Sequence, residues 1–261
     1  MNTVIGIDLG TQSLKVLFYA ADRREVVATG TAPLDLHRAD GGVAEQHAEW
    51  WLQALREAMR QVDPEVRETA RSVAVSGQQH GFVAVDKADR VLSPVKLWCD
   101  TSTRQQCADI SRDFGGFDAC IREVGNPILV GYTAPKVRWL RDARPRDYEK
   151  LDGILLPHDY LNLVLTGERC MEMCDASGTG FLDIRSRTWS AGMLRAIDPD
   201  RDLAECLPVP RSNNEAIGTV DGEVIVFINS DATPETDDWL EKLIAPLANP
   251  GVGATYGRQT A

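Results

Sequence analysis

The sequence has no surplus of positive charge and no long apolar run. Its 28 Lys and Arg residues face 39 Asp and Glu residues, which gives a formal net charge of -11. A surface for nucleic acid or for an anionic membrane needs a basic patch, so this balance argues against both kinds of partner. No window approaches the roughly 20 apolar residues that a membrane span needs, and no basic run followed by an apolar stretch indicates a secretory signal. A nucleotide stays open as a ligand, because a metal ion and a few backbone donors can neutralise a triphosphate locally.

Paired cysteine motifs are also absent. The six cysteines show no Cys-x-x-Cys spacing and have no neighbouring histidine that would complete a metal site. Such cysteines are typical of reduced, mostly buried thiols in a cytosolic protein, and we expect a cytoplasmic location. The length of 261 residues and the hydrophobic content of 43% suffice for one large or two modest domains with a real core.

Hydrophobic periodicity predicts an α/β chain. Three strand-like segments open the sequence, a helix follows and a buried strand comes next, at residues 3–9, 13–20, 25–32, 47–61 and 72–76. Residues 82–85 are interpreted as a continuation of that last strand beyond a turn. The pattern of residues 101–169 is mostly helical, with one short strand at 154–156. Three antiparallel strands, a helix and a further strand form an α/β arrangement.

The opening segment, residues 4–16, carries the strongest chemical signal. A short apolar strand ends in Asp8, turns through Gly10 and Thr11, and resumes as a second strand. A carboxylate at a strand end can hold a hydrated Mg²⁺, and the turn with Gln12 can offer backbone N–H groups and a hydroxyl to a phosphate. The alternative is an ordinary hairpin in which Asp8 and Thr11 satisfy their own turn.

Two further segments place polar side chains at strand ends. Residues 76–81 set two amides and an imidazole between glycines, which suits the hydroxyls of a polyol or, alternatively, a tight hairpin that caps itself. Downstream, Trp98 and Asp100 close another strand. Together they are suited to holding a sugar, whereas separately Trp98 is typical of a core residue and Asp100 of the N-cap of a helix that begins near Thr101. His47 and His158 are interpreted as surface or capping residues, because no metal-ligand spacing joins them.

Several separated motifs in this order resemble one enzyme family. They lie at residues 5–11, 77–81, 133–136, 155–160, 166–168 and 175–179, with Leu182, Asp183 and Trp189 after them. Together they resemble the FGGY carbohydrate kinases, and among these the xylulokinase group, within the sugar-kinase, actin and heat-shock-70 superfamily. The resemblance covers about residues 3–220. It implies a ribonuclease H-like fold, which is a mixed sheet flanked by helices.

The same resemblance implies roles for particular residues. Residues near the Mg²⁺–ATP complex are Asp8, Gly10, Thr11 and Gln12, with Asp8 as the metal-holding carboxylate; residues near the sugar are Gln79, His80 and Asp100. Close relatives often carry Met at the position of Gln79. The implied reaction is ATP-dependent phosphorylation of D-xylulose or a similar ketopentose or polyol.

The catalytic aspartate of the family is not found in this sequence. In the family it lies in a Gly-Asp-Asn stretch that begins the second half of the protein, and no such stretch occurs here. We therefore assign no catalytic residue in this chain and expect little or no activity from it alone. A non-catalytic sugar-binding module is the alternative function. Surface that the second lobe covers in the family would be exposed, so a homodimer or other self-association is expected.

The end of the sequence resembles a different family. Residues 221–261 are similar to a fragment of a family 2 glycosyltransferase, in which Asp231 matches the acid that binds metal and sugar nucleotide. The pattern predicts a strand at 224–231, a helix at 237–247 and a strand at 251–259. The alternative is a plain strand–helix–strand unit with Asp231 as a helix cap. We therefore divide the chain into a kinase-like lobe, 1–220, and an incomplete appendage, 221–261.

Overall fold

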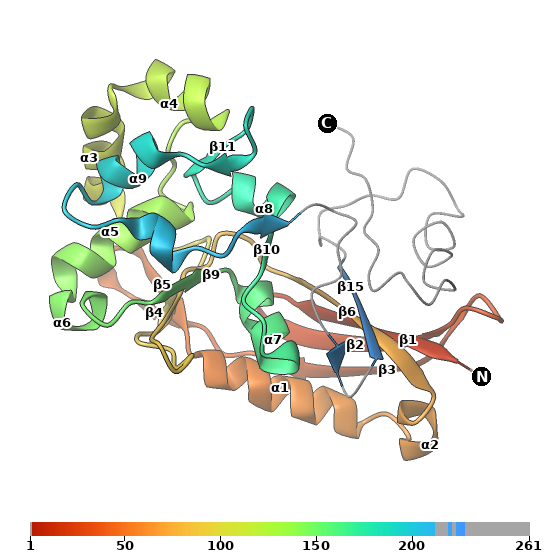
Figure 1. Cartoon of the computed structure of the whole chain (residues 1–261). Helices are drawn as coiled ribbons and strands as arrows, with labels where there is room; N and C mark the ends of the chain where they lie inside the picture. Colours follow the sequence, from red (N-terminus) through yellow and green to blue (C-terminus); the bar gives the residue numbers. More distant parts are fainter. Residues whose placement is uncertain (1, 212–218, 221–222, 228–261) are drawn as a thin grey trace.

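The structure, a computed structural model, describes residues 2–211, 219–220 and 223–227. Within these residues a half built on a central sheet lies beside a half built mainly of helices (Figure 1). Each half has its own cluster of buried apolar side chains. Among the residues that the structure describes, no helix combines the length and the apolar character needed to span a membrane.

The central sheet is mixed, as predicted. Its strand order is β14-β15-β6-β1-β2-β3. The bounds are Thr3–Leu9 for β1, Ser13–Ala20 for β2, Glu25–Pro33 for β3, Ala70–Gly77 for β6, Thr219–Val220 for β14 and Glu223–Phe227 for β15. β1, β2 and β3 run antiparallel in succession, whereas β6 runs parallel to both β1 and β15. Alternate residues of β2, such as Leu14, Val16 and Phe18, are buried, which is the period-two pattern of a strand with one face on the core.

Helix α1, Ala48–Arg60, covers one face of this sheet and packs against β2 and β3 (Figure 1). Its buried face carries Trp51, Ala54 and Ala58. The indole N–H of Trp51 donates to Oε1 of Gln46 at 2.9 Å, so the ring is buried without an unpaired donor. A single turn, α2 at Pro64–Arg67, leads on to β6.

Short strands connect the central sheet to the rest of the molecule. β4, β5 and β8, at His37–Ala39, Val43–Gln46 and Val95–Lys96, form a small antiparallel sheet, with the 3-10 turn Asp40–Gly42 between the first two. β7, Val83–Val85, pairs antiparallel with β9, Gly153–Leu155. The prediction that residues 82–85 continue the preceding strand is therefore wrong. The buried run belongs to a separate two-stranded sheet.

Helices dominate from Arg104 onward, as predicted. The helices are α3 Arg104–Phe114, α4 Phe117–Val124, α5 Thr133–Ala143, α6 Pro145–Tyr148, α7 Pro157–Thr166, α8 Met173–Ser177, α9 Ala191–Ile197 and the 3-10 helix Leu203–Cys206. Short strands join them: β10 Met171–Glu172 pairs with β13 Pro210–Arg211, and β11 Leu182–Asp183 pairs with β12 Thr188–Trp189. α3, α5 and α9 pack on one another around buried side chains such as Ile110, Val137 and Met193.

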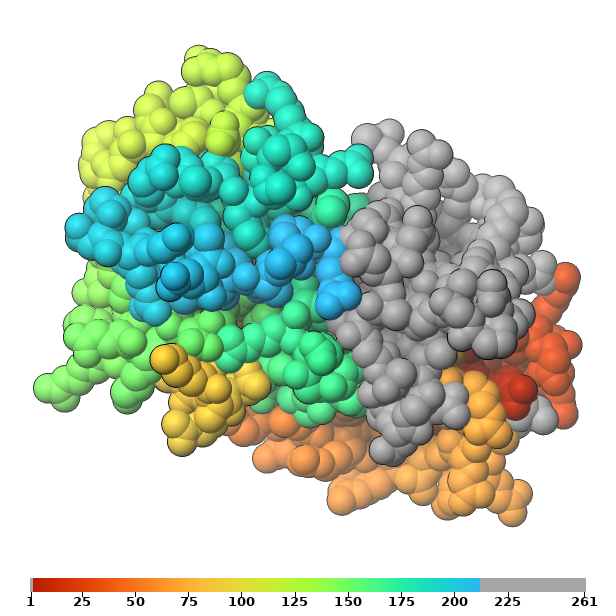
Figure 2. Space-filling model, viewed as in Figure 1, coloured from red at the N-terminus to blue at the C-terminus, as the bar shows by residue number. Residues whose placement is uncertain are grey.

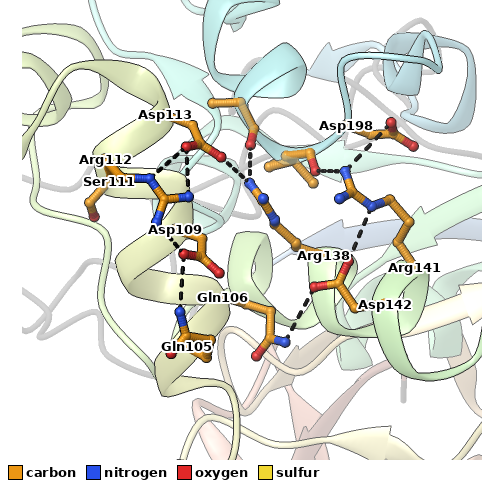
Figure 3. Close-up of polar contacts among 12 residues, drawn as sticks. Gln105, Gln106, Asp109, Ser111, Arg112, Asp113, Arg138, Arg141, Asp142 and Asp198 are labelled. Carbon is orange, nitrogen blue, oxygen red and sulfur yellow. Dashed lines mark hydrogen bonds and ion pairs between the residues drawn. The ribbon is translucent and has the colours of Figure 1, made fainter.

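Charged side chains tie these three helices together at the surface (Figure 3). Arg138 of α5 binds the carboxylate of Asp113 on α3 at 2.8 Å and donates to the carbonyl of Ala196 at 2.7 Å. Arg141, one turn later on α5, donates to the carbonyl of Ile197 at 2.8 Å. Both carbonyls belong to the last residues of α9, where cationic donors satisfy unpaired acceptors and complement the helix dipole.

The segment that follows α9 returns toward the centre of the molecule. In Figure 2 it is the blue band that lies against the green residues of the helical half. Arg201 fastens it by donating to the carbonyl of Tyr148 at 2.6 Å and to that of Leu151. β13, at the end of this segment, pairs parallel with β10.

The predicted appendage begins within the described residues and continues beyond them. Its first strand is observed at Glu223–Phe227, inside the central sheet and next to β6. The predicted helix at 237–247, the predicted strand at 251–259 and Asp231 lie outside the described residues. The glycosyltransferase-like interpretation therefore stays a prediction.

Candidate functional site

The site forms where two parallel strands end at the same edge of the sheet. β1 ends at Leu9 and β6 ends at Gly77, and these two residues are register partners. The N–H of Gln78 donates to the carbonyl of Leu9 at 2.8 Å, which holds the loop after β6 against the turn after β1. The turn itself is closed by the N–H of Gly10, which donates to the carbonyl of Ser13 at 3.0 Å. Pairing of the strands thus brings the first predicted motif beside the second.

A cleft of about 400 Å³ lies at this junction. Its lining residues come from three separate segments: Asp8, Gly10, Thr11, Gln78, Gln79, His80 and Trp98. Five of the seven predicted site residues are therefore brought together. Gln12 is exposed and does not line the cleft, although its carbonyl accepts from the N–H of Leu34 at 2.8 Å.

Asp100, the seventh predicted residue, is fully buried and does not line this cleft. Its Oδ2 accepts from the N–H of Ala44 at 2.8 Å and from Nζ of Lys96 at 3.2 Å, and its Oδ1 accepts from Ser102. The alternative interpretation as a helix N-cap is wrong, because α3 begins at Arg104 after Thr103. Asp100 joins β5, β8 and the segment that carries Trp98.

Trp98 is half-exposed, at 51%, and forms one wall of the cleft. Its indole N–H donates to the Thr11 hydroxyl at 3.0 Å, and that hydroxyl donates to Oε1 of Gln78 at 3.1 Å. The interpretation of Trp98 as a core residue is wrong. Gln78 was not singled out by the sequence, although its place in the predicted polar loop was the available signal. A ring face and a fixed amide in one cleft suit the C–H and O–H groups of a carbohydrate.

The loop at 77–81 holds His80 in an unusual backbone conformation, with φ of 60°. Nζ of Lys136, at the start of α5, donates to the carbonyl of His80 at 2.6 Å and to that of Gly131 at 2.5 Å. The Thr133 hydroxyl donates to the same His80 carbonyl at 3.3 Å. Burial lowers the pKa of Lys136 to about 7, against the opposing attraction of Asp100. Strained backbone that neighbouring groups hold in place is typical of functional loops.

Asp8 carries the charge in the cleft. Burial raises the pKa of its carboxyl, and Lys15, its register partner on β2, offsets this in part. Among the described residues, no cluster of three or more His, Cys, Asp or Glu side chains is arranged to hold a metal ion by itself. A single carboxylate in an open cleft fits Mg²⁺, which keeps several waters and binds through one or two carboxylates plus substrate phosphates.

A larger cavity of about 580 Å³ lies on the surface away from these residues. Its two arginine side chains bind protein groups. Arg90 pairs with Asp86 at 2.7 Å, and Arg201 donates to the carbonyls of Tyr148 and Leu151. The smaller cleft, where polar groups from three segments converge, is therefore the candidate site.

Comparison with known proteins decides the family. The model of the FGGY family of carbohydrate kinases, N-terminal domain, matches residues 3–229. This chain belongs to the FGGY family. The match extends beyond Val220, the predicted lobe boundary, and includes β15.

Individual FGGY kinases agree with this assignment. The chain is 35% identical over 227 residues to a xylulose kinase of Haemophilus influenzae, covering 84% of this chain and 46% of that protein. It is 36% identical over 221 residues to a xylulose kinase of Escherichia coli, and the match covers 84% of this chain and 44% of that protein. The chain thus spans about half the length of the curated relatives that it matches.

Solved structures show the same fold. A xyloylose kinase from Brucella ovis superposes with a TM-score of 0.77 at 32% identity, covering 84% of this chain and 45% of that one. A glycerol kinase from Plasmodium falciparum, solved with ADP, also superposes with a TM-score of 0.77. Its identity is 21%, and the match covers 84% of this chain and 45% of that one. The predicted ribonuclease H-like architecture is confirmed.

One prediction about histidines is wrong. His158 was interpreted as a surface or capping residue, but it is only 3% exposed and lies inside α7. His47 does occupy the N-cap position of α1, although its side chain makes no capping hydrogen bond. One partner, Asp159, is the next residue in the chain, whereas the other, Asp175, lies on α8, so sequence spacing gave no signal for it.

Proposed function

We propose that this chain is the sugar-binding lobe of an ATP-dependent kinase that phosphorylates D-xylulose or a similar ketopentose. The observation that carries the proposal is the shared cleft. The carboxylate of Asp8 and the side chains of Gln79 and His80 line the same cavity. Phosphoryl transfer requires a metal-bound nucleotide and a hydroxyl group close together, since its catalysis is mainly positioning and charge neutralisation. The similarity to xylulose kinases supports the choice of sugar.

Each part of the cleft has a role in this proposal. Asp8 would hold hydrated Mg²⁺, which neutralises the phosphate charge when ATP is bound. Gly10 and Thr11 would lie near the phosphates, with Gln12 on the outer side of the same turn. His80 and Gln79 would bind sugar hydroxyls, and the ring of Trp98 would cover the C–H face. Asp100, being buried, would act by holding the Trp98 segment in place.

The proton of the reacting hydroxyl needs an acceptor. In the family that acceptor is an aspartate in a Gly-Asp-Asn stretch, which this sequence does not contain. We therefore infer that the chain alone binds sugar with little or no turnover. A sugar-binding module without catalysis is the second candidate function, and the lack of a Gly-Asp-Asn stretch in this sequence favours it.

An ADP-release assay with ATP, Mg²⁺ and D-xylulose tests the proposal. We expect no release above background from this chain, together with saturable D-xylulose binding. Asp8→Asn should abolish protection of the chain by Mg²⁺–ATP against thermal unfolding and leave sugar binding within about twofold. Robust ADP release would show that the chain contains its own general base, and protection by Mg²⁺–ATP that survives in Asp8→Asn would remove Asp8 from the metal site.

Self-association is part of the same proposal. Phe117 and Val209 are among the large apolar side chains left exposed, and exposed apolar surface favours association. Light scattering at increasing concentration should detect a dimer or larger species.

The cytoplasmic location remains a prediction; all six thiols are free in the structure.

A further inference from the structure

A buried histidine lies directly behind the candidate sugar site. His158 is the second residue of α7, and its Nε2 lies 3.1 Å from Oδ1 of Asp159 and 3.1 Å from Oδ2 of Asp175. Burial by itself disfavours the charged ring, but the two carboxylates outweigh it and raise the pKa of His158 to about 9. The ring lies between two carboxylates from different helices, an arrangement that favours its imidazolium form.

The second oxygen of Asp175 extends this cluster into the cleft. Oδ1 accepts a hydrogen bond from Nε2 of Gln79 at 3.1 Å. The main-chain N–H of Asp175 is bound in turn by Oε2 of Glu172 at 3.1 Å, which fixes the start of α8. A continuous set of polar contacts therefore runs from Asp159 through His158 and Asp175 to a residue that lines the cleft.

This geometry sets the orientation of the Gln79 carboxamide. A carboxylate only accepts hydrogen bonds, so the NH₂ end of the amide must face Asp175 and its carbonyl oxygen must lie on the other side. A carbonyl oxygen recognises a donor, such as a sugar hydroxyl. Without a cation between them, Asp159 and Asp175 would repel each other, and this repulsion would act on the carboxylate that accepts from Gln79.

Close packing aligns the loop with the same helix. A Cβ atom on Gly81 would come within 2.6 Å of Cγ of Pro157, and one on Gly77 within 3.3 Å of Cβ of His158. Gly81 therefore leaves no room for a side chain against the first turn of α7, and Gly77 packs tightly on the same turn. Helix α7 positions the loop backbone directly and the Gln79 side chain through Asp175.

We propose that His158 is a positioning residue for sugar recognition. Its imidazolium holds the Asp175 carboxylate where that group orients the Gln79 carboxamide toward a sugar hydroxyl. This inference rests on the proposed function for its ligand, but the orientation of Gln79 is a property of the sugar-free protein. The proposed function and the positioning role of His158 can therefore fail separately.

Two variants separate the charge of His158 from its bulk. His158→Gln removes the cation and keeps a polar side chain, whereas His158→Lys keeps a cation between the two carboxylates. NMR of the sugar-free chain follows the side-chain NH₂ signals of Gln79, assigned by their loss in Gln79→Ala. We expect solvent exchange of these protons to accelerate at least tenfold in His158→Gln and to stay within twofold of wild type in His158→Lys.

Sugar binding supplies the second readout. D-Xylulose affinity should fall about tenfold in His158→Gln and recover in His158→Lys. In a Gln79→Ala background, His158→Gln should cause no further loss, because residues that act through one another are not additive. Asp175→Asn should reproduce the change in Gln79 exchange, and it serves as the test if His158→Gln does not fold.

Unchanged Gln79 signals in His158→Gln or Asp175→Asn would overturn the inference. The inference would also be overturned if His158→Gln lowered the D-xylulose affinity equally in the wild-type and the Gln79→Ala backgrounds. If wild type binds no D-xylulose, the proposed function fails, and the exchange of the Gln79 amide still decides whether His158 positions it.

Discussion

Nζ of Lys136 lies 2.6 Å from the main-chain carbonyl oxygen of His80 and donates a hydrogen bond to it. This contact joins the first turn of α5 to a loop residue whose φ is 60°. The lysine is fully buried, so it serves the loop backbone and not the solvent. The conformation of the cleft therefore depends on residues that do not line it.

Lys136→Met should destabilise the loop. The variant removes the Lys136 donor from the carbonyls of His80 and Gly131 and leaves His80 only the longer contact with the Thr133 hydroxyl at 3.3 Å. An unpaired polar group away from water costs about 1–3 kcal/mol. We expect the free energy of unfolding to fall by an amount of this order in urea denaturation, and D-xylulose affinity to fall with it. Lys87→Met, at an exposed site, is the matched control and should change neither. Full sugar affinity in Lys136→Met would show that the loop keeps its shape unaided.

Gly178→Ala should displace the His80 ring. A Cβ atom at Gly178 would lie 2.3 Å from Cε1 of His80, while its own φ of -78° is ordinary for alanine. The clash should weaken D-xylulose binding at least tenfold, measured by calorimetry. Gly167→Ala is the control. A Cβ atom at Gly167 would meet no neighbouring atom, but the backbone φ of 76° is unfavourable for alanine. This variant should therefore lose about 1–2 kcal/mol of stability and keep its sugar affinity. Equal sugar affinity in both variants would contradict the placement of His80.

Thr11→Val should loosen the Trp98 wall. The near-isosteric change removes the hydroxyl that accepts from the indole N–H at 3.0 Å. We expect D-xylulose affinity to fall about threefold to tenfold, since a hydrogen bond contributes about 0.5–1.5 kcal/mol. Sugar-induced change of tryptophan fluorescence is the readout, and its loss in Trp98→Leu identifies the signal. Thr31→Val, at an exposed position of β3, is the control.

The stabilising effect of His158 should depend on pH. Its pKa is raised from 6.5 to about 9 on folding, so the folded state holds a proton that the unfolded state releases between these values. The stability that the imidazolium provides is therefore complete below pH 6.5 and disappears as the pH rises through about 9. Urea denaturation of wild type and His158→Gln should show a difference that shrinks over this interval. A difference that grows toward alkaline pH would mean that the ring is neutral in the fold.

Local patterns predicted the sheet half well. Alternation of buried and exposed residues in β2 specifies both a strand and its face, and the boundaries of β1 and β2 agree with the prediction. Parallel pairing of β1 with β6 then places the two polar motifs at one edge. The residues of β7 are all buried, so no periodicity shows which strand they pair with, and that prediction was wrong.

Contacts between distant segments could not be predicted in the same way. Asp100 was expected near the sugar, but its environment depends on Lys96 and on the main chain of Ala44. His158 was expected at the surface or at a cap, but it is buried by elements on either side and paired with Asp175. Burial of a polar residue depends on partners elsewhere in the chain, and one sequence gives no pattern for such partners.

Calorimetric titration of D-xylulose into wild type and His80→Ala tests the central claim most directly. We predict one saturable site in wild type, an affinity at least tenfold weaker in His80→Ala, and no change in the control Lys87→Ala. Absence of saturable heat in wild type, or equal affinity in His80→Ala, would contradict the assignment of this cleft to a sugar.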